Sequence, residues 1–373
     1  MKTFNKTILL FIISAGMISC SDNNEILTVI NQDGSCYREF SANVDSAFMV
    51  GDKTDKQNPF PVEIDSNWKI AWKHNDGEIQ TEFPISAEKY NELKDSSINS
   101  NKFTVLIHRD YESVAEMREL FKLKPSHEWA KMDVKYDFKK SFRWFYTYYA
   151  YRETYPKIEH SFISLDEYMT KDEEQFWFTG KPDLLRGMNG IEIEEYVSNL
   201  DEKYNKWLFK NYWNAMYDVL TENFDELNMS VVKNDFILVR DSLFERSFSK
   251  IKNGELLMSQ CLDNHFKTNK VTLFWKDENG LTKDADDFLL GQDFVKPLEN
   301  SFTYKLIIPG EIVEAENAVF QNKILSWRLT AYRMFFDDYI IEAKSRIINY
   351  WAFITTGIIV LISIFCLFYK PKK

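Results

Sequence analysis

Apolar and polar positions alternate in the first part of the chain, which is the pattern of half-buried β-strands. Residues 26–30 and 35–40 show it on either side of Asp33-Gly34, a dipeptide typical of tight hairpin turns. The same signals continue downstream. They predict a second hairpin from residues 68–72 and 79–83 around Asn75-Asp76-Gly77, a strand at residues 103–108, and a short helix at residues 113–121.

Residues 132–150 form the longest regular pattern, with apolar side chains at nearly every second position. This period of two predicts one long strand, or two strands joined at Lys139-Lys140-Ser141. A single straight strand of this length would reach about 60 Å, so we expect it to bend around a core.

After residue 164 the apolar spacing changes to steps of three and four residues, which is the helical period. The longest such run covers residues 193–220, and Ser164 is a candidate cap for an earlier helix that begins at Leu165. Further helices are predicted at residues 234–249 and 255–266. Strand patterns then return at residues 271–275, 302–308, 312–319, 323–330 and 339–343.

These elements predict an α+β fold, in which strands from the N- and C-terminal segments share an antiparallel sheet and a central helical insertion packs beside it. An uncharged run of 23 residues follows at 347–369. As a helix it would reach roughly 34 Å, enough to cross a hydrocarbon core of about 30 Å. The predicted parts are β-rich residues 20–163, the helical insertion 164–270, β-rich residues 271–346, the transmembrane helix 347–369 and a cytoplasmic tail 370–373.

The N-terminus has the pattern of a secretory signal peptide, residues 1–19, in which Lys2 and Lys6 precede a short apolar run. Met17-Ile18-Ser19-Cys20 resembles the lipobox of bacterial lipoproteins, which implies cleavage before Cys20 and attachment of lipid, palmitate-like acyl chains included, to that residue. An ordinary signal peptide with a cysteine near its cleavage site is the alternative.

The two ends of the chain together predict the protein's location in the cell. Outer membranes are usually crossed by barrels, so a helical span favours the inner, cytoplasmic membrane, with the ectodomain in the periplasm. The basic tail then faces the cytoplasm by the positive-inside rule. Asp22 and Glu25 loosely resemble a signal for export to the cell surface. We give the helix more weight, because a hydrophobic span contributes far more to membrane affinity than these few residues change.

Composition narrows the partners. The formal charge is −11, and five lysines lie in the signal, tail and membrane flank, so the ectodomain carries about −16. Nucleic acid is excluded as a partner because its binding needs a basic footprint, and broad adhesion to anionic lipid is disfavoured. Aromatic residues make up 16% of the chain, which indicates a folded ectodomain.

The sequence contains no recognisable catalytic, cofactor or metal-binding motif, and its five histidines are isolated, so we expect no catalytic residue, cofactor or metal. Cys36 and Cys261 would share an oxidising compartment, where they either form a disulfide or remain buried thiols. The remaining candidate is an aromatic band. Its residues are either core or an apolar groove or partner surface, and include Trp144, Tyr146, Tyr148, Trp207 and Trp213.

The last part of the ectodomain resembles a known family. Ile308-Pro309-Gly310-Glu311-Ile312-Val313, Ile324-Leu325-Ser326-Trp327-Arg328-Leu329 and Ile341-Glu342-Ala343 just before a membrane helix look like the LppM-like domain of bacterial lipoproteins. The resemblance covers about the last 75 residues and the general layout. It implies a β-rich extracytoplasmic domain and lipid binding, whereas the helical insertion departs from the family's pattern.

Three function classes follow. The first is a non-enzymatic envelope lipoprotein that binds a lipid or apolar ligand, or docks another membrane component. The second is a structural or assembly factor of the envelope, and the third is a hydrolase without a recognisable motif. An enclosed apolar pocket would favour ligand binding, a flat aromatic patch would favour a partner, and converging carboxylates would favour an enzyme.

Overall fold

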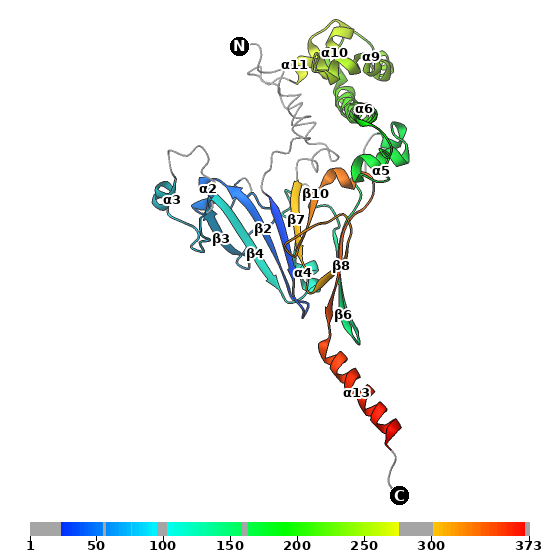
Figure 1. The fold of residues 1–373 in the computed structure, drawn as a ribbon. Coiled ribbons are helices and arrows are strands. Elements are labelled where there is room, and N and C mark those ends of the chain that lie inside the picture. The colour runs from blue at the N-terminus through cyan, green and yellow to red at the C-terminus, as the bar shows by residue number, and fades with distance from the viewer. Residues whose placement is uncertain are drawn as a thin grey trace. The chain divides into compact units, whose positions relative to one another are not determined.

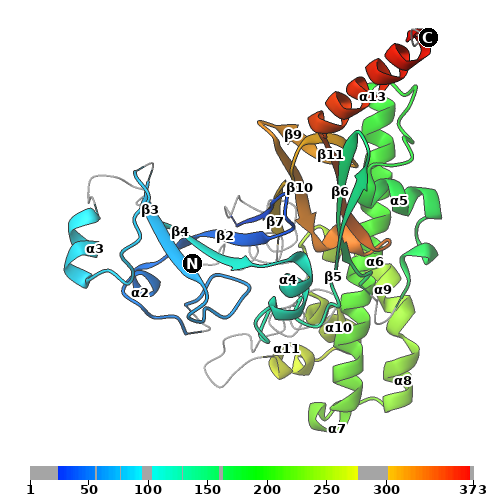
Figure 2. The same cartoon turned by 90° about the horizontal axis from the view of Figure 1, so that it is seen from below.

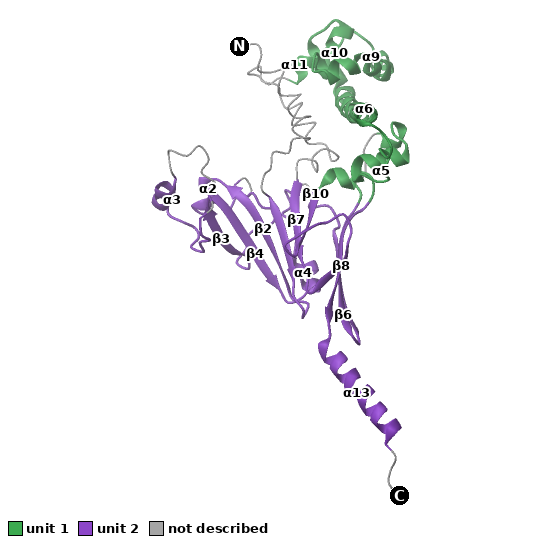
Figure 3. Ribbon diagram, viewed as in Figure 1, with its two compact units in different colours: residues 1–20, 157–300, 330–337 green, residues 21–156, 301–329, 338–373 purple. Residues whose placement is uncertain are grey.

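The computed structural model describes residues 24–54, 57–75, 77–94, 103–127, 129–158, 163–275 and 301–369 (Figure 1). The chain divides into two compact units (Figure 3). The helical unit contains residues 157–300 and 330–337, and the sheet unit contains residues 21–156, 301–329 and 338–373. Both helices and antiparallel strands are present, so the predicted α+β class is confirmed. The predicted signal peptide, Cys20 and residues 370–373 lie outside the described residues.

The larger of two sheets in the sheet unit has seven strands in the order β3-β4-β2-β1-β7-β10-β9. Its first hairpin, β1 to β2, forms as predicted, with Gly34 at a φ of 98° in the turn. β1 also pairs in parallel with β7, so N- and C-terminal segments share this sheet. The strands are β1 Glu25–Ile30, β2 Cys36–Val44, β3 Lys69–His74, β4 Phe103–Tyr111, β7 Ser301–Ile307, β9 Val319–Gln321 and β10 Ile324–Thr330.

The smaller sheet has four antiparallel strands in the order β5-β6-β11-β8. They are β5 Lys135–Arg143, β6 Tyr146–Tyr155, β8 Glu311–Ala315 and β11 Tyr339–Ile348. The turn from β7 into β8 passes through Gly310, where a Cβ atom would lie 2.3 Å from the carbonyl oxygen of Arg346 on β11. Only glycine fits there, so the predicted Pro309-Gly310 turn is held against β11.

The prediction of one long strand at residues 132–150 is wrong, and so is the alternative break at residues 139–141. The chain turns at Trp144 and Phe145, and β5 and β6 pair as a hairpin (Figure 2). Tyr136 pairs with Glu153, which puts even positions of β5 and odd positions of β6 on one buried face. The apparent alternation continued across the turn only because β6 carries aromatic residues on both of its faces.

Two other predicted hairpins formed only in part. Residues 79–83 contribute a single bridge, Trp72 to Gln80, and β3 takes β4 as its partner instead. Of residues 312–319, only Val319 pairs with the segment at residues 323–330, through Ser326. β8 joins β11 in the smaller sheet, and the short strand β9 makes the hairpin with β10.

Short helices complete the sheet unit and one long helix ends it. They are α2 Ser46–Met49, α3 Ala87–Leu93, α4 Val114–Leu120 and α13 Tyr350–Phe368. α4 confirms the helix predicted at residues 113–121, and Ser113 caps it by accepting a hydrogen bond from the backbone N–H of Glu116.

The helical unit is built around α6, Gly190–Glu222, a helix of 33 residues. Its described residues also form η1 Leu165–Glu167, α5 Lys171–Thr179, α7 Phe224–Leu227, α8 Lys233–Leu238, α9 Arg240–Lys252, α10 Met258–Phe266, α11 Lys270–Phe274 and η3 Ala331–Met334. Ser164 precedes only the 3₁₀ turn η1 and makes no side-chain cap. The helix predicted at residues 234–249 is divided between α8 and α9.

The strand predicted at residues 271–275 is wrong, because this segment is the helix α11. The Asp263 carboxylate accepts hydrogen bonds of 3.0 Å from the backbone N–H groups of both Val271 and Thr272. These are donors that a helix start leaves without an intrahelical partner. A side chain on α10, outside this segment, therefore caps a short apolar run whose own pattern is ambiguous.

Candidate functional site

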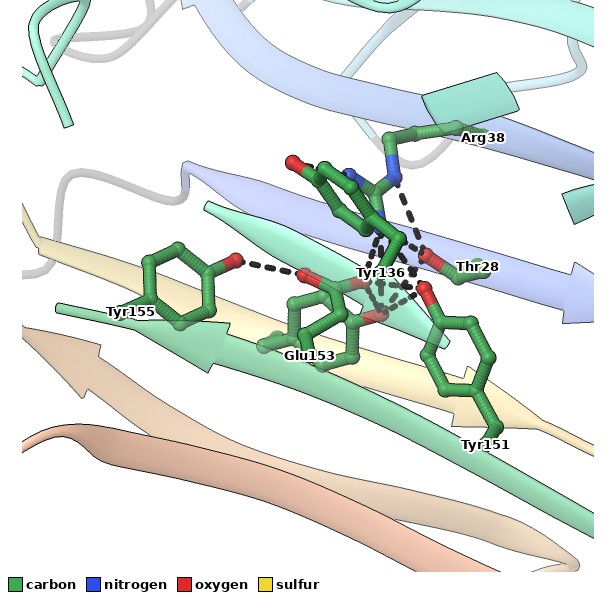
Figure 4. A network of polar contacts seen from close by, with 7 residues as sticks. Thr28, Arg38, Tyr136, Tyr151, Glu153 and Tyr155 are labelled. Atoms are coloured by element: carbon green, nitrogen blue, oxygen red, sulfur yellow. Dashed lines mark hydrogen bonds and ion pairs between the residues drawn. The ribbon is translucent and has the colours of Figure 1, made fainter. Parts of the chain in front are cut away.

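The sheet unit contains a charged network at positions that the strand alternation directs inward. Arg38 on β2 and Glu153 on β6 are 1% and 0% exposed, although charged residues are rarely buried completely. Thr28 on β1 and Tyr304 on β7 also face this interior. Figure 4 shows that the side chains converge from strands of both sheets.

Glu153 is the acceptor at the centre of the network. One carboxylate oxygen accepts from Arg38 Nη2 and from the hydroxyls of Tyr151 and Tyr304, and the other accepts from the Tyr155 hydroxyl at 2.7 Å. Both oxygens therefore have charged or hydroxyl donors, which is the condition under which a buried carboxylate is tolerated.

Arg38 is surrounded in a similar way. Its Nε and Nη2 donate to Thr28 Oγ1 at 3.2 and 3.0 Å. The guanidinium carbon lies 4.8 Å from the centre of the Phe121 ring and 5.2 Å from that of Tyr136, so two aromatic faces also contact the cation. The charge is held by side chains from several strands and by the half-buried ring of Phe121 at the end of α4.

The environment favours one protonation state throughout. Burial alone would lower the pKa of Arg38, but the facing Glu153 carboxylate offsets this and holds the pKa well above its ordinary value. Burial, reinforced by the same carboxylate, raises the pKa of Tyr151, Tyr155 and Tyr304 well above that of a free tyrosine. The hydroxyls therefore stay neutral and donate, and Arg38 stays charged, at all physiological pH values.

This network fits an interior anchor better than a reaction centre. All of its hydrogen-bonded residues are buried, so a substrate has no exposed polar atom of the network to approach. Since Arg38 belongs to the seven-stranded sheet and Glu153 to the four-stranded sheet, their pairing ties one sheet to the other. A slip of either strand by one residue would turn its charge away from its partner.

The second unusual feature is the connection between the smaller sheet and the apolar helix α13. β11 ends at Ile348 and α13 begins at Tyr350, so Asn349 alone separates them. The Asn349 side chain accepts from Thr147 Oγ1 at 3.0 Å and donates to the carbonyl oxygens of Arg143 at 2.9 Å and Trp144 at 3.2 Å. Its backbone N–H donates to the Phe145 carbonyl at 2.9 Å. The β5–β6 turn is therefore bonded to the start of α13.

Aromatic rings extend this contact along the helix. Trp351 lies against two rings, with centroids 6.2 Å from Phe142 and 5.2 Å from Trp144. Phe145 contacts Phe353 at 4.6 Å. The Trp144 indole N–H also donates to Thr356 Oγ1 at 2.8 Å. We call the contact between residues 142–145 and the first two turns of α13 the aromatic junction.

α13 has the length and the apolar composition of a helix that could cross a membrane. Within the described part of the chain it is the one helix long and apolar enough to cross a membrane, and nearly all of its side chains are exposed. A helix of this kind that is not buried in protein is stable in lipid rather than in water. Of the predicted cellular location, the structure supports only membrane association through this helix.

The predicted aromatic band separates into two groups. Trp207 and Trp213 are both 0% exposed core residues of the helical unit, so the core alternative, and not the surface one, holds for these two. Their indole N–H groups donate to the main-chain carbonyls of Ile163 at 2.9 Å and Arg240 at 3.0 Å, which makes burial of the ring possible. Trp144 is 45% exposed, and Tyr146 and Tyr148 are half-buried on the outer face of β6.

The two cysteines considered as a disulfide are free thiols in different units. Both are buried, and burial raises the pKa of Cys36 to about 11 and also raises that of Cys261. Neither thiol has the thiolate character that reactive cysteines need. The alternative of two buried thiols is the one found in the structure.

A depression of about 360 Å³ lies near β3, lined by residues that include Lys53, Asp65, Trp68 and Phe83. It is open and largely polar, unlike the enclosed apolar pocket expected for a lipid carrier. Across the described residues, no group of three or more His, Cys, Asp or Glu side chains could hold a metal ion.

Arg38, Glu153 and Asn349 were not among the residues singled out from the sequence. Arg38 and Glu153 could have been recognised as charged residues on the buried face of a strand. Arg38 shares that face with Phe40 on β2, and Glu153 shares it with Tyr151 on β6. Asn349 stands inside the uncharged run, where a polar residue between strand and helix marks a capping position.

No known protein family, curated protein or solved structure matches this chain. The resemblance of the C-terminal segment to LppM-like lipoproteins therefore remains a proposal.

Proposed function

We propose that this protein is a non-catalytic, membrane-anchored component of the bacterial cell envelope, whose sheet unit contacts lipid or another membrane component at the membrane surface. The observation that carries the proposal is the connection through Asn349, in which strand passes into membrane helix without a flexible linker. A simple tether needs only length and flexibility. A bonded junction instead sets the orientation of the sheet unit relative to the bilayer.

The position of the exposed aromatic residues supports the same proposal. Phe142 and Trp144 are exposed and lie beside Trp351 at the start of α13. Aromatic side chains with a polar tip are enriched where a protein meets the headgroup layer. The charged network offers no alternative surface because it is sealed inside the sheet unit.

The proposed location and orientation in the cell follow from the sequence. Cys20 carries the lipid, α13 crosses the inner membrane, the two units face the periplasm, and the basic end of the chain is cytoplasmic. Under the LppM-like resemblance, lipid is the first partner to examine. Two anchors together would make the membrane association effectively permanent.

The anchor is tested by replacing Cys20 with Ser and extracting membranes with alkaline carbonate. We expect the variant to stay in the membrane through α13, and mass spectrometry of the wild-type N-terminal peptide to show an acylated Cys20. Release of the Cys20→Ser chain into the soluble fraction would refute the spanning helix, and an unmodified wild-type Cys20 would refute the lipid anchor.

The role of the rigid connection is tested by inserting Gly-Ser-Gly-Ser after Asn349 and purifying the protein in mild detergent. Native mass spectrometry then measures the lipid or membrane protein bound per chain. The insertion should reduce this occupancy, whereas the same insertion after Gly187, in an exposed loop of the helical unit, should leave it unchanged. Equal occupancy in all three proteins would show that the junction does not serve binding.

A further inference from the structure

We propose that the tip of the β5–β6 hairpin, residues 142–145, is immersed in the bilayer beside α13, with the Arg143 guanidinium at the level of the phospholipid phosphates. This inference rests on the proposed function, because it requires that α13 spans the membrane. It adds a second element of the sheet unit to the membrane-embedded part and names the phosphate group of phospholipids as its ligand.

The length of α13 carries the first step. Its 19 residues, Tyr350–Phe368, reach about 28 Å, which barely matches a hydrocarbon core of about 30 Å. The helix therefore has no turn to spare on the side of the sheet. If the first two turns were in water, the residues from Gly357 onward would reach only about 18 Å, too short to cross.

The contacts of the hairpin carry the second step. Trp144 reaches Thr356 with its indole N–H, and Thr356 lies about 9 Å along the helix from Tyr350. Phe142 and Phe145 contact Trp351 and Phe353 in the same two turns. Whatever depth these turns have in the bilayer, the hairpin tip has it too.

The chemistry of the tip suits that depth. Phe142 is 61% exposed, which is costly in water and favourable among lipids. Main-chain carbonyls of Arg143, Trp144 and Phe145 are all hydrogen-bonded to Asn349. Polar backbone groups that are satisfied within the protein meet the main condition for entering a low-dielectric layer.

Arg143 is the charged group at the tip, and its surroundings favour a phosphate. Its guanidinium lies 5.7 Å from the Tyr148 ring centre, and no carboxylate of the described residues is within 4 Å of it. By contrast, Arg346 near the end of β11 is paired with Glu311 at 3.1 Å, which raises the pKa of Arg346. A free guanidinium beside the Tyr148 ring at the headgroup level is matched by a lipid phosphate, which accepts hydrogen bonds from several of its N–H donors.

The test places an encoded fluorescent amino acid at Phe142 of the full chain, reconstituted in nanodiscs of phosphatidylethanolamine and phosphatidylglycerol. Ile79, 60% exposed beyond the end of β3, is the matched control, and Leu361 in the middle of α13 reports insertion of the helix. Quenching is measured with aqueous acrylamide and, separately, with lipids brominated on their acyl chains.

We expect the Phe142 probe to be quenched by brominated lipid and to be at least about threefold less sensitive to acrylamide than the Ile79 probe. A Phe142 probe that behaves like the Ile79 probe, while the Leu361 probe is quenched by brominated lipid, overturns the immersed hairpin alone. A Leu361 probe that brominated lipid does not quench overturns the spanning helix and with it the proposed function. If the probe at Phe142 prevents folding, Trp144 is the second position, with the same expectations.

The phosphate contact has its own variant. Arg143→Glu should increase acrylamide quenching of the Phe142 probe, because the new carboxylate is repelled by the phosphates. Lys139→Glu makes the same charge change four residues earlier on β5, on an exposed side chain outside the junction, and should change little. Equal effects of the two substitutions would overturn the assignment of Arg143 to the phosphate level.

Discussion

The interiors of the two units are stabilised in different ways. The helical unit has an apolar and aromatic cluster around the second half of α6, in which Trp213 and Tyr217 direct their polar atoms to nearby main-chain carbonyls. The sheet unit instead buries Arg38 and Glu153, whose partners are side chains, some on other strands and some, like Tyr155, on the strand of Glu153 itself. These two groups of the helical unit are therefore satisfied by main-chain carbonyls. Arg38 and Glu153 of the sheet unit are satisfied by other side chains.

The backbone explains the difference. Strand carbonyls in the middle of a sheet are already used by their neighbours in the ladder, so a buried guanidinium must find side-chain acceptors. These acceptors are then specific, since only a residue at one position can reach. We therefore expect the sheet unit to depend on a few exact partners and the helical unit on the volume it fills.

The largest effect is expected for Arg38→Met. The substitution leaves the Glu153 carboxylate buried without its cation, which destabilises a protein by about 3 to 5 kcal/mol. Hydrogen exchange measured by mass spectrometry should rise in β2, β6 and β7 and not in α6 or α9. The double variant Arg38→Met, Glu153→Leu should recover much of the lost protection from exchange. If the double variant is as poorly protected as Arg38→Met alone, the pair contributes more to stability than cancelling the cost of its own burial.

A volume change should have the corresponding effect in the helical unit. Leu220 is fully buried in the α6 cluster, so Leu220→Ala leaves a cavity and costs about 3 kcal/mol. Faster exchange should appear in α6 and α9, with the strands unaffected. Leu238→Ala, on an exposed side chain, is the control and should stay within about 0.5 kcal/mol. Comparable losses from both would contradict a well-packed cluster.

A pair of tyrosines separates exact partners from mere burial inside the sheet unit. Tyr155→Phe removes the donor to one Glu153 oxygen and should cost about 1 to 2 kcal/mol. The Tyr111 hydroxyl is buried with no hydrogen-bond partner in the described structure, so Tyr111→Phe should be neutral or stabilising. Denaturant unfolding of both variants checks this, and the expected order fails if Tyr111→Phe is the more harmful change.

Alkaline pH should weaken the sheet unit through the same hydroxyls. Because the pKa of Tyr304 is raised by folding, its contribution is fully present below the unfolded pKa near 10 and is lost as pH rises above it. Each such tyrosine adds a loss of about 1.4 kcal/mol per pH unit in that range. Tyr304→Phe should reduce the slope of the free energy of unfolding against pH by the contribution of one proton. Denaturant titrations between pH 9 and 11 measure this slope, and an unchanged slope would show that Tyr304 does not contribute to it.

Local patterns predicted the elements whose signal is long or marked by a turn. The hairpin of β1 and β2, the long helix α6 and the apolar helix α13 all follow from residue spacing and turn residues within a few positions of each other. The pattern failed at residues 132–150, because a two-residue turn between strands with aromatic residues on both faces leaves the alternation uninterrupted. It failed at α11 because Asp263 supplies the cap from outside the segment.

The amino-acid sequence by itself determined the α+β class, the helical middle of the chain and the apolar helix at its end, because each depends on periodicity and composition over short stretches. Only the tertiary structure decided what lies together. Arg38 and Glu153 are 115 positions apart and meet because two sheets face each other, and Trp144 meets Thr356 across 212 positions because β11 continues into α13. Pairings of this kind depend on the free energy of the whole packed unit, for which no local pattern of residues carries a signal.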